Sequence, residues 1–310
     1  MIVLVIAGHV LKEKQFDNIS ECIIAWQWIY IFHIPLFVFI SGYFTRKKNR
    51  KNFFSSIWKL LEPLILFQII AIAPKLISNG FVPLSDILTP RWILWYLLSL
   101  IFWRIILQIL PDKLLNNTKL IICIAFCISI IAGYLPFDRF LSLQRTLSFM
   151  PFFFLGYFMK DKNLFLPQKY KSLCFVFLII SFAIPIFFSQ YLGSMTHADP
   201  YGNKLGAIQR IIVFSLSIPM SLAFINICPN TKWIAKQGKL TMQYYLYHAL
   251  VIPPLMVVVT VLGIPFSLFT AILYTLIITI GIGVILYLPY IGKLTNPSLF
   301  IKSKMRMRLF

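Results

Sequence analysis

Residues 29–43 read Ile-Tyr-Ile-Phe-His-Ile-Pro-Leu-Phe-Val-Phe-Ile-Ser-Gly-Tyr, an apolar run with one histidine, His33, near its start. A second histidine, His9, follows Gly8 at the end of the preceding apolar run. An ionisable side chain is costly to keep in hydrocarbon, so two histidines in neighbouring apolar runs indicate a functional pair. The rest of the sequence must therefore show whether these runs lie in a membrane.

The composition is typical of a polytopic membrane protein. Of the 310 residues, 59% are apolar and 12% are charged, and the mean hydropathy is +0.84. Soluble domains are about half apolar and a quarter charged. Apolar runs of about 20 residues, enough for a helix to cross a bilayer, recur along the chain and are too uniformly apolar for barrel strands. The sequence predicts an all-α fold, a transmembrane bundle of about ten helices.

The expected spans cover the chain as one integral-membrane domain, residues 1–310. The first run, Met1–Leu11, is about half the length that a span needs, so we expect the chain to lack part of its first helix. The second span ends at Thr45. The others are expected at 53–73, 92–110, 119–135, 146–159, 172–190, 208–227, 241–262 and 266–290. No internal repeat is evident, which argues against a transporter built from repeats.

Basic residues are distributed unequally between alternate loops. Loops 46–51, 111–119, 160–171, 229–240 and 291–310 hold far more Lys and Arg than loops 12–28, 74–91, 135–145 and 190–207. By the positive-inside rule, both termini are cytoplasmic in a multi-pass protein of the cell (plasma) membrane. The rule also accounts for the net charge of +20, so the lipid bilayer is an expected partner and nucleic acid is not. The basic tail Lys302–Arg308 is expected to lie on an anionic leaflet.

The five cysteines do not indicate a metal site or a disulfide framework. Cys22 stands alone in a predicted loop, and the other four lie in or at apolar segments, so all are expected to be small core residues. His9 and His33 are both expected about 5–6 Å below the outer interface. The alternative is that both snorkel to water as interfacial residues. A metal site is disfavoured because no third histidine shares their loop.

Several motifs occur in a characteristic order. They are residues 2–9 ending in Gly-His, residues 32–43 (Phe-His-Ile-Pro-Leu-Phe-Val-Phe-Ile-Ser-Gly-Tyr), Lys59-Leu-Leu-Glu-Pro63, Trp95-Tyr96-Leu97, Arg145 to Gly156, and Tyr247-His248. This series resembles the acyltransferase 3 family, especially its fucose 4-O-acetylase-like branch, over nearly the whole chain. Relatives usually carry an acidic and a basic residue ahead of the Gly-His helix, and here nothing precedes Met1.

The resemblance implies transfer of an acetyl group from cytoplasmic acetyl-CoA, a co-substrate rather than a bound cofactor. The implied acceptor is a carbohydrate hydroxyl of a cell-surface or lipid-linked polysaccharide, in a bacterial cell envelope. His9 corresponds to the catalytic base, and an imidazole with a pKa of about 6.5 suits that role. His33 would orient His9 or hold the acceptor, and a covalent acetyl-histidine remains an alternative. The rival interpretation is a transporter or flippase of a lipid-linked glycan, which needs no thioester donor.

Buried cations are candidates for binding the anionic donor from the inside. Lys59 is one, although an ion pair with Glu62 is an equal alternative. Arg104 is another, although it can instead snorkel toward the Pro111 loop. Ser41 and Tyr96 are further candidates because they lie in the matching motifs.

Other candidates lie toward the predicted outer side or deeper in the bundle. Arg145 and Arg210 fall at outer helix ends, and the resemblance favours Arg145 as a ligand while Arg210 suits an interfacial anchor. His248 is too deep to snorkel and is either a ligand or a structural histidine. The outer loop Thr196–Asn203, with His197, Asp199 and Tyr201, is expected to be solvated, and contact with a sugar is the alternative.

Small residues and prolines predict how the helices meet. Gly42 and Gly156 are expected to permit close helix approach. The prolines are expected to break helix hydrogen bonds where a cavity forms, at Pro35, Pro151 and Pro253-Pro254.

Overall fold

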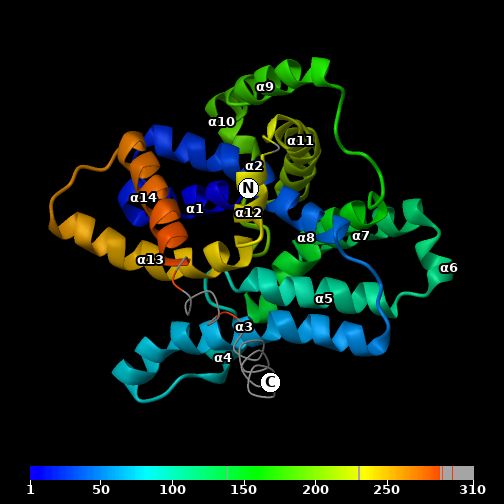
Figure 1. The fold of residues 1–310 in the computed structure, drawn as a ribbon, viewed down its shortest axis with the longest axis horizontal. Coiled ribbons are helices and arrows are strands. Elements are labelled where there is room, and N and C mark those ends of the chain that lie inside the picture. The colour runs from blue at the N-terminus through cyan, green and yellow to red at the C-terminus, as the bar shows by residue number, and fades with distance from the viewer. Residues whose placement is uncertain (138, 230, 287, 289–294, 296–310) are drawn as a thin grey trace, which may run out of the picture.

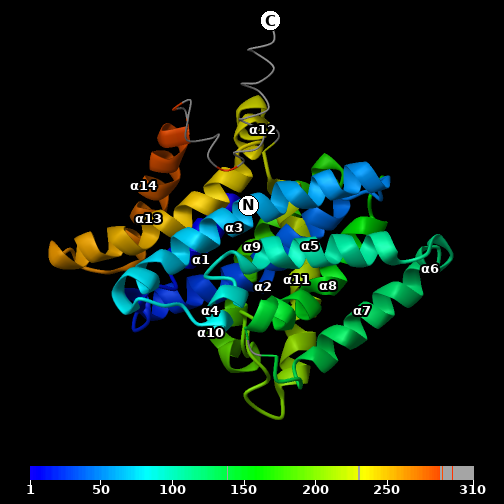
Figure 2. The ribbon, with the colours of Figure 1, turned by 90° about the horizontal axis from the view of Figure 1, so that it is seen from below.

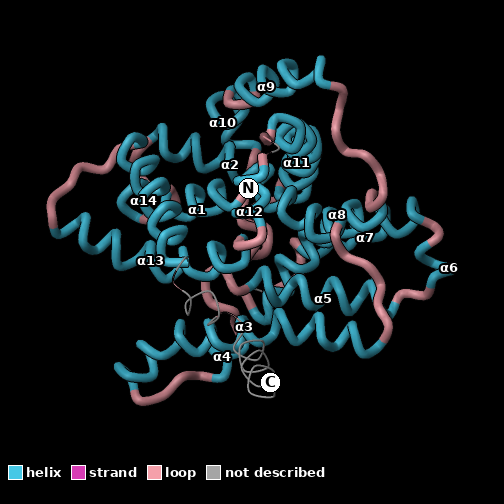
Figure 3. The backbone as a smooth tube through the Cα atoms, viewed as in Figure 1, coloured by secondary structure: helices cyan, strands magenta, loops and turns pink. Residues whose placement is uncertain are grey.

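The computed structural model describes residues 1–137, 139–229, 231–286, 288 and 295, and these form helices and loops with no strand among them (Figure 3). The helices are α1 Ile2–Val10, α2 Ser20–Tyr43, α3 Arg50–Asn79, α4 Leu84–Leu88, α5 Trp95–Ile109, α6 Asp112–Leu115, α7 Thr118–Ala132, α8 Leu143–Phe158, α9 Lys171–Ile180, α10 Ala183–Phe188, α11 Gly206–Ile227, α12 Lys232–Gly238, α13 Thr241–Val261 and α14 Leu268–Leu286. The predicted basic tail Lys302–Arg308 lies outside the described residues.

Every predicted span contains a helix, which confirms the all-α membrane bundle. In the described part of the chain, six segments are long and apolar enough to cross a membrane: α2, α3, residues 168–191, α11, α13 and α14. The shorter helices α1, α5, α7 and α8 occupy the other four predicted spans. Helices α4, α6 and α12 lie in segments that were predicted to be loops.

The predicted start of the second span is wrong. Residues 20–27, expected in a polar loop, form the first turns of α2. Polar residues such as Gln27 suggested a loop, but a helix at an interface tolerates them, and Glu21 in the first turn suits the positive end of the helix dipole. His33 therefore lies near the middle of α2 and not near its outer end.

The span predicted at 172–190 is broken into α9 and α10. Pro185 has no amide hydrogen for the carbonyl of Ser181, and its ring crowds that carbonyl, so the helix ends there. The Ser181 hydroxyl donates to the Leu178 carbonyl oxygen at 2.7 Å. Pro35 and Pro151, by contrast, lie inside continuous helices. The expected loss of a helix hydrogen bond is seen at Pro35, where the carbonyl oxygen of Ile31 accepts instead from the hydroxyl of Ser217.

Helix α2 packs against α8 and α11 at the centre of the bundle, with α13 and α14 to the left and α6 and α7 to the right in Figure 1. The contact between α2 and α8 brings backbone against backbone. A Cβ atom on Gly42 would lie 1.9 Å from the carbonyl oxygen of Phe153, and one on Gly156 would lie 1.9 Å from that of Phe39. The prediction that these two glycines permit close approach is confirmed, and each glycine faces the other helix.

The loops gather at two ends of the bundle in the predicted alternation. Ion pairs join the predicted inner loops, with Arg46 3.1 Å from Asp161 and Lys47 2.7 Å from Asp112. Residues of the predicted outer loops meet in a cavity described below. Figure 2 shows α3 and α5, which contact each other, lying along the bundle between these ends. Which end faces the cytoplasm stays a prediction.

The chain folds back after α3. Gly80 has a φ of 73°, which suits a helix end in the left-handed conformation. The side-chain amide of Gln68 on α3 then donates to the carbonyl oxygen of Thr89 at 3.1 Å and accepts from the backbone N–H of Arg91 at 3.0 Å. Segment 80–94 is thereby held along the second half of α3, and α5 begins within the bundle.

The outer loop before α11 is packed into the bundle at His197 and Ala198, so the prediction of a solvated loop is wrong there, whereas Asp199, Gly202 and Asn203 are exposed as predicted. His197 is 4% exposed, and its ring lies between aromatic side chains of α8 and α11. Arg210 is also buried, with its guanidinium 4.5 Å from the ring centre of Tyr201 and a hydrogen bond to a backbone carbonyl of α7. Arg210 therefore links this loop to α7 inside the bundle and is not an interfacial anchor.

Candidate functional site

A cavity of about 380 Å³ lies where α1, α2, α8 and α13 meet the predicted outer loops. We call it the histidine cavity. It is lined by His9, Lys12, Glu13, Tyr30, Trp92, Ile93, Arg139, Arg145, Thr196, Asp199, His248, Ala249, Ile252 and Pro253. Acid, base and cationic side chains from segments far apart in the sequence converge here, which is the pattern expected of a site that performs chemistry.

Two histidines face each other in this cavity. The ring centres of His9 and His248 are 5.1 Å apart. Nδ1 of His248 lies 3.0 Å from the carbonyl oxygen of Tyr244, and because a carbonyl only accepts, the proton is on Nδ1. Nε2 of His248 is then an acceptor without a hydrogen-bond partner among the described residues. The cavity thus presents imidazole groups that can take a proton from a hydroxyl.

His33 stands behind the cavity wall. Its ring packs edge-on against Tyr30, with ring centres 4.5 Å apart, and its Nδ1 lies 2.8 Å from the carbonyl oxygen of Ile29. Tyr30 lines the cavity and His33 does not. The structure therefore places the ring of His248 against that of His9. His33 lies behind Tyr30, within electrostatic range of His9, in a position from which it supports Tyr30.

Gly8 sets the distance between α1 and α2 beside this pair. A Cβ atom at Gly8 would lie 2.9 Å from Cε2 of Tyr30 and 3.6 Å from a methyl group of Ile29. A larger residue would push the Tyr30 ring. The Gly-His sequence thus has a physical reason. The missing side chain of Gly8 leaves room for the Tyr30 ring, and the next residue, His9, lines the histidine cavity.

Arg145 is a cation without a counter-ion in the described structure. Its guanidinium lies 4.9 Å from the ring centre of Trp95, and its buried Nε has no hydrogen-bond partner among the described residues. A charge in such a place is costly unless it meets an anion. Arg145 lines the histidine cavity, so its position suits a ligand-binding role.

Ser41 and Tyr96 lie together below the histidine cavity. Their hydroxyl groups form a hydrogen bond, and Ser41 also donates to the carbonyl oxygen of Phe37 at 3.0 Å. The Tyr96 ring contacts Phe37 and Tyr245, with ring centres 5.0 and 5.7 Å away. We call Phe37, Tyr96 and Tyr245 the aromatic layer. Tyr245 connects it to the cavity, because its ring centre lies 6.1 Å from that of His248.

The other predicted cations lie at the opposite end. Arg104 contacts the carbonyl oxygen of Ser56 at 3.4 Å, and with Arg46 and Lys48 it lines a cavity of about 100 Å³. Partial burial, together with the charges of Arg104 and Lys59, lowers the pKa of Lys48. Lys59 is exposed, so the prediction that its charge is buried is wrong. We call Arg46, Lys48, Lys59 and Arg104 the inner cation cluster.

The alternatives for two of these residues fare differently. Arg104 turns toward Ser56 and not toward the Pro111 loop, so the snorkelling interpretation is wrong. The ion pair of Lys59 with Glu62 stays a prediction.

The structure separates the predicted site residues into groups. His9, Arg145 and His248 line one cavity, His33 lies behind it, Ser41 and Tyr96 lie below it, and Lys59 and Arg104 lie at the other end. Three of the lining residues were not predicted from the sequence, namely Tyr30, Trp92 and Arg139, and two more, Thr196 and Asp199, were expected to be solvated. Only Tyr30 had a local signal, since it lies one helical turn before His33.

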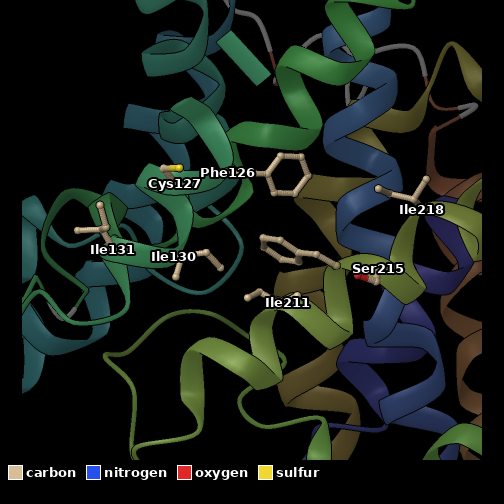
Figure 4. A pocket seen from close by; sticks show the side chains of 8 residues that line it. Phe126, Cys127, Ile130, Ile131, Ile211, Ser215 and Ile218 are labelled. Carbon is tan, nitrogen blue, oxygen red and sulfur yellow. The ribbon is translucent and has the colours of Figure 1, made fainter. Parts of the chain in front are cut away.

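An apolar cavity of about 530 Å³ lies between α7 and α11. Figure 4 shows Phe126, Cys127, Ile130 and Ile131 on the α7 side and Ile211, Ser215 and Ile218 on the α11 side. The eight described residues that line it include no histidine, carboxylate or cation. Its lining thus offers hydrocarbon contact and no acid–base chemistry.

In the described part of the chain, no group of three or more His, Cys, Asp or Glu side chains is placed to hold a metal ion.

The family of the chain follows from its sequence comparison. No curated protein and no solved structure matches the chain. The model of the acyltransferase 3 family, described as an acyltransferase domain, matches residues 1–290. That range contains the histidine cavity, the aromatic layer and the inner cation cluster. The chain therefore belongs to the acyltransferase 3 family and is a membrane acyltransferase.

Proposed function

We propose that this acyltransferase moves an acetyl group from cytoplasmic acetyl-CoA to a hydroxyl of a cell-surface or lipid-linked polysaccharide. The observation that carries the proposal is the His9–His248 pair, with ring centres 5.1 Å apart, in a cavity also lined by Arg145. Acyl transfer to a hydroxyl needs a base at the nucleophile and a positive group near the developing oxyanion. The cavity holds both kinds of group.

His9 is the proposed base. In direct transfer, the hydroxyl oxygen attacks the thioester carbonyl carbon, His9 takes the hydroxyl proton, the C–S bond breaks, and His9 returns the proton to the CoA sulfur. A positioned imidazole contributes about 10²- to 10⁴-fold to such a step. In the alternative, His9 or His248 is acetylated first and the sugar hydroxyl then attacks the acetyl-imidazole.

The inner cation cluster is the proposed anchor for the phosphates of acetyl-CoA. Arginine and lysine side chains bind phosphate through charge-assisted hydrogen bonds, and Arg104 offers a buried Nε without a partner among the described residues. An acetyl group held from this end has to pass the aromatic layer to reach His9. The Ser41–Tyr96 hydrogen bond lies on that path, so both residues are proposed to line the donor channel.

The experiment that tests this function uses purified protein and acetyl-CoA labelled in the acetyl group. Incorporation of label into a lipid-linked or capsular saccharide fraction, matched by release of CoA thiol, is the expected result. A flippase would move the glycan without consuming acetyl-CoA. Absence of thiol release in the presence of any saccharide fraction of the host envelope would remove the proposal.

Alanine variants distinguish the role of His9 from that of His33. His9→Ala is expected to abolish transfer, whereas His33→Ala is expected to be milder because His33 acts on Tyr30 and not on the substrate. Equal loss at both positions would contradict this division of roles.

A further inference from the structure

A second cavity, of about 470 Å³, adjoins the histidine cavity. We call it the arginine cavity. It is lined by Asp86, Thr89, Pro90, Arg91, Trp92, Arg139, Ser142, Arg145 and Ala198. Trp92, Arg139 and Arg145 line both cavities, so a molecule that fills one extends directly into the other.

The arginine cavity carries an excess of positive charge. Three guanidinium groups line it, against one carboxylate, that of Asp86. Asp86 already forms ion pairs with Lys75 and with Arg91, whose terminal nitrogen lies 3.0 Å from its carboxylate. The hydrogen bond from Lys75 lowers the pKa of Asp86, so this carboxylate is ionised, but it is shared between two cations. Arg139 pairs with Asp199 at 3.2 Å, outside this cavity's lining.

Two of the three arginines hold unused hydrogen-bond donors. Nε of Arg91 and Nε of Arg145 are buried and have no hydrogen-bond partner among the described residues. A guanidinium offers five N–H donors in a planar fork that matches a carboxylate or phosphate. Buried donors of this kind are normally satisfied, so two beside one cavity indicate a ligand that supplies acceptors.

The backbone around the cavity is strained. Trp92 and Ser142, which line it, have φ values of 46° and 56°, and the neighbouring Leu141 has 46°. Residues other than glycine rarely adopt such a conformation, and these conformations concentrate at ligand sites. Ser142 also precedes α8 without capping it through its side chain, so the positive end of that helix adds to the field.

We propose that the arginine cavity binds an oxyanion of the acceptor saccharide, through Arg91, Arg139 and Arg145, and so holds a sugar hydroxyl in the histidine cavity. The proposal rests on the proposed function, because it assigns the acceptor side of the same reaction. It makes the acceptor an anionic saccharide. The oxyanion is either a phosphate, as in a lipid-linked saccharide, or the carboxylate of an acidic sugar.

The donor is not the occupant of this cavity. Acetyl-CoA also carries phosphates, but the residues around the arginine cavity belong to loops that the charge asymmetry places outside. The inner cation cluster lies at the opposite end of the bundle and is available to the donor. Each anionic substrate then has its own arginines, one set at each end.

The test is a binding measurement on the purified full chain. Sodium pyrophosphate and sodium glucuronate are the probes, with sodium chloride at equal ionic strength as the reference, and the thermal midpoint against concentration gives the affinity. We expect one of the two probes to raise the midpoint in a saturable way. Pyrophosphate as the tighter ligand would assign the site to a phosphate, and glucuronate would assign it to an acidic sugar.

Variants locate the binding. Loss of charge-assisted hydrogen bonds in Arg91→Gln and Arg139→Gln is expected to weaken the probe by about tenfold or more. Arg91→Lys, which keeps the charge and loses the fork, is expected to recover only part of the affinity. Lys204→Gln, an exposed lysine in the same set of loops, is the matched control and is expected to bind as the wild type does. Arg139 lies in a surface ion pair, so its variant tests the site without disturbing the core.

Three outcomes would overturn the proposal: no probe raises the midpoint above chloride, Lys204→Gln weakens binding as much as the arginine variants, or the arginine variants weaken acetyl-CoA binding by the same factor. If a probe binds but the protein transfers no acetyl group, the proposed function is refuted and the oxyanion site is retained. Transfer to a saccharide by a protein that binds neither probe would remove this site alone.

Discussion

Replacing Gly42 by alanine should separate the two central helices. The added Cβ atom would lie 1.9 Å from the carbonyl oxygen of Phe153, and ordinary contact begins at 3.4 Å, so α2 and α8 must part by about 1.5 Å. The neighbouring atoms are backbone and cannot turn aside. Over-packing of this kind costs about 1–3 kcal/mol, and more where relaxation is blocked.

The assay is thermal unfolding of the detergent-solubilised protein, followed by tryptophan emission or by loss of the monodisperse peak. At about 2–4 °C per kcal/mol, Gly42→Ala should lower the midpoint by several degrees. Gly156→Ala should do the same, because its Cβ would meet the carbonyl oxygen of Phe39 at 1.9 Å. The double variant should lose less than the sum, since one separation of the helices accommodates both methyl groups.

Gly281→Ala is the matched control. Gly281 lies within α14, and apart from the helix's own neighbouring backbone no atom of the described residues lies within 4 Å of a Cβ built there. Alanine in a helix interior is favoured over glycine by about 0.5–1 kcal/mol, so this variant should unfold at or slightly above the wild-type temperature. A Gly42→Ala protein as stable as the wild type, or strictly additive effects in the double variant, would refute the backbone contact between α2 and α8.

Further predictions concern the site and the topology. Gly8→Ala should lower kcat by moving the Tyr30 ring into the histidine cavity while the unfolding temperature changes little; an unchanged kcat would contradict the contact at 2.9 Å. Burial, aided by nearby arginine charges, lowers the pKa of His197 well below 6.5, so the fold should lose stability as the pH falls below about 6.5, where the unfolded chain takes up a proton that the folded chain does not. His197→Phe should flatten this loss, and equal slopes for both proteins would exclude His197 as its source. In a cysteine-free background, an impermeant thiol reagent should label Lys204→Cys and not Lys162→Cys in intact cells; the reverse would invert the topology.

The helices were predictable because hydrophobic runs of spanning length determine them. The misplaced start of α2 shows the limit: Glu21 and Gln27 are polar in composition yet helical in structure, since water at an interface satisfies them. The break between α9 and α10 had a local cause in Pro185. Similar prolines, such as Pro35, do not interrupt their helices, so the residue type alone did not decide the outcome.

The candidate site was predictable only in its parts. His9, Arg145 and His248 each had a motif, but their meeting depends on how α1 packs between α2 and α13, which no local pattern encodes. Gly42 and Gly156 each predicted a close helix contact, but the sequence did not show that their two helices contact each other. Trp92 and Arg139 come from loops, and a loop's position in a cavity follows from the helices that it connects.

The most direct test of the central claim is the rate of CoA thiol release by the purified His9→Ala protein in the presence of saccharide, with and without added imidazole. We expect a fall of about 10²- to 10⁴-fold with an unchanged unfolding temperature, and partial recovery when imidazole enters the histidine cavity. A His9→Ala protein that releases thiol within about tenfold of the wild-type rate, a far smaller loss than removal of a general base causes, would contradict the assignment of His9 as the catalytic base.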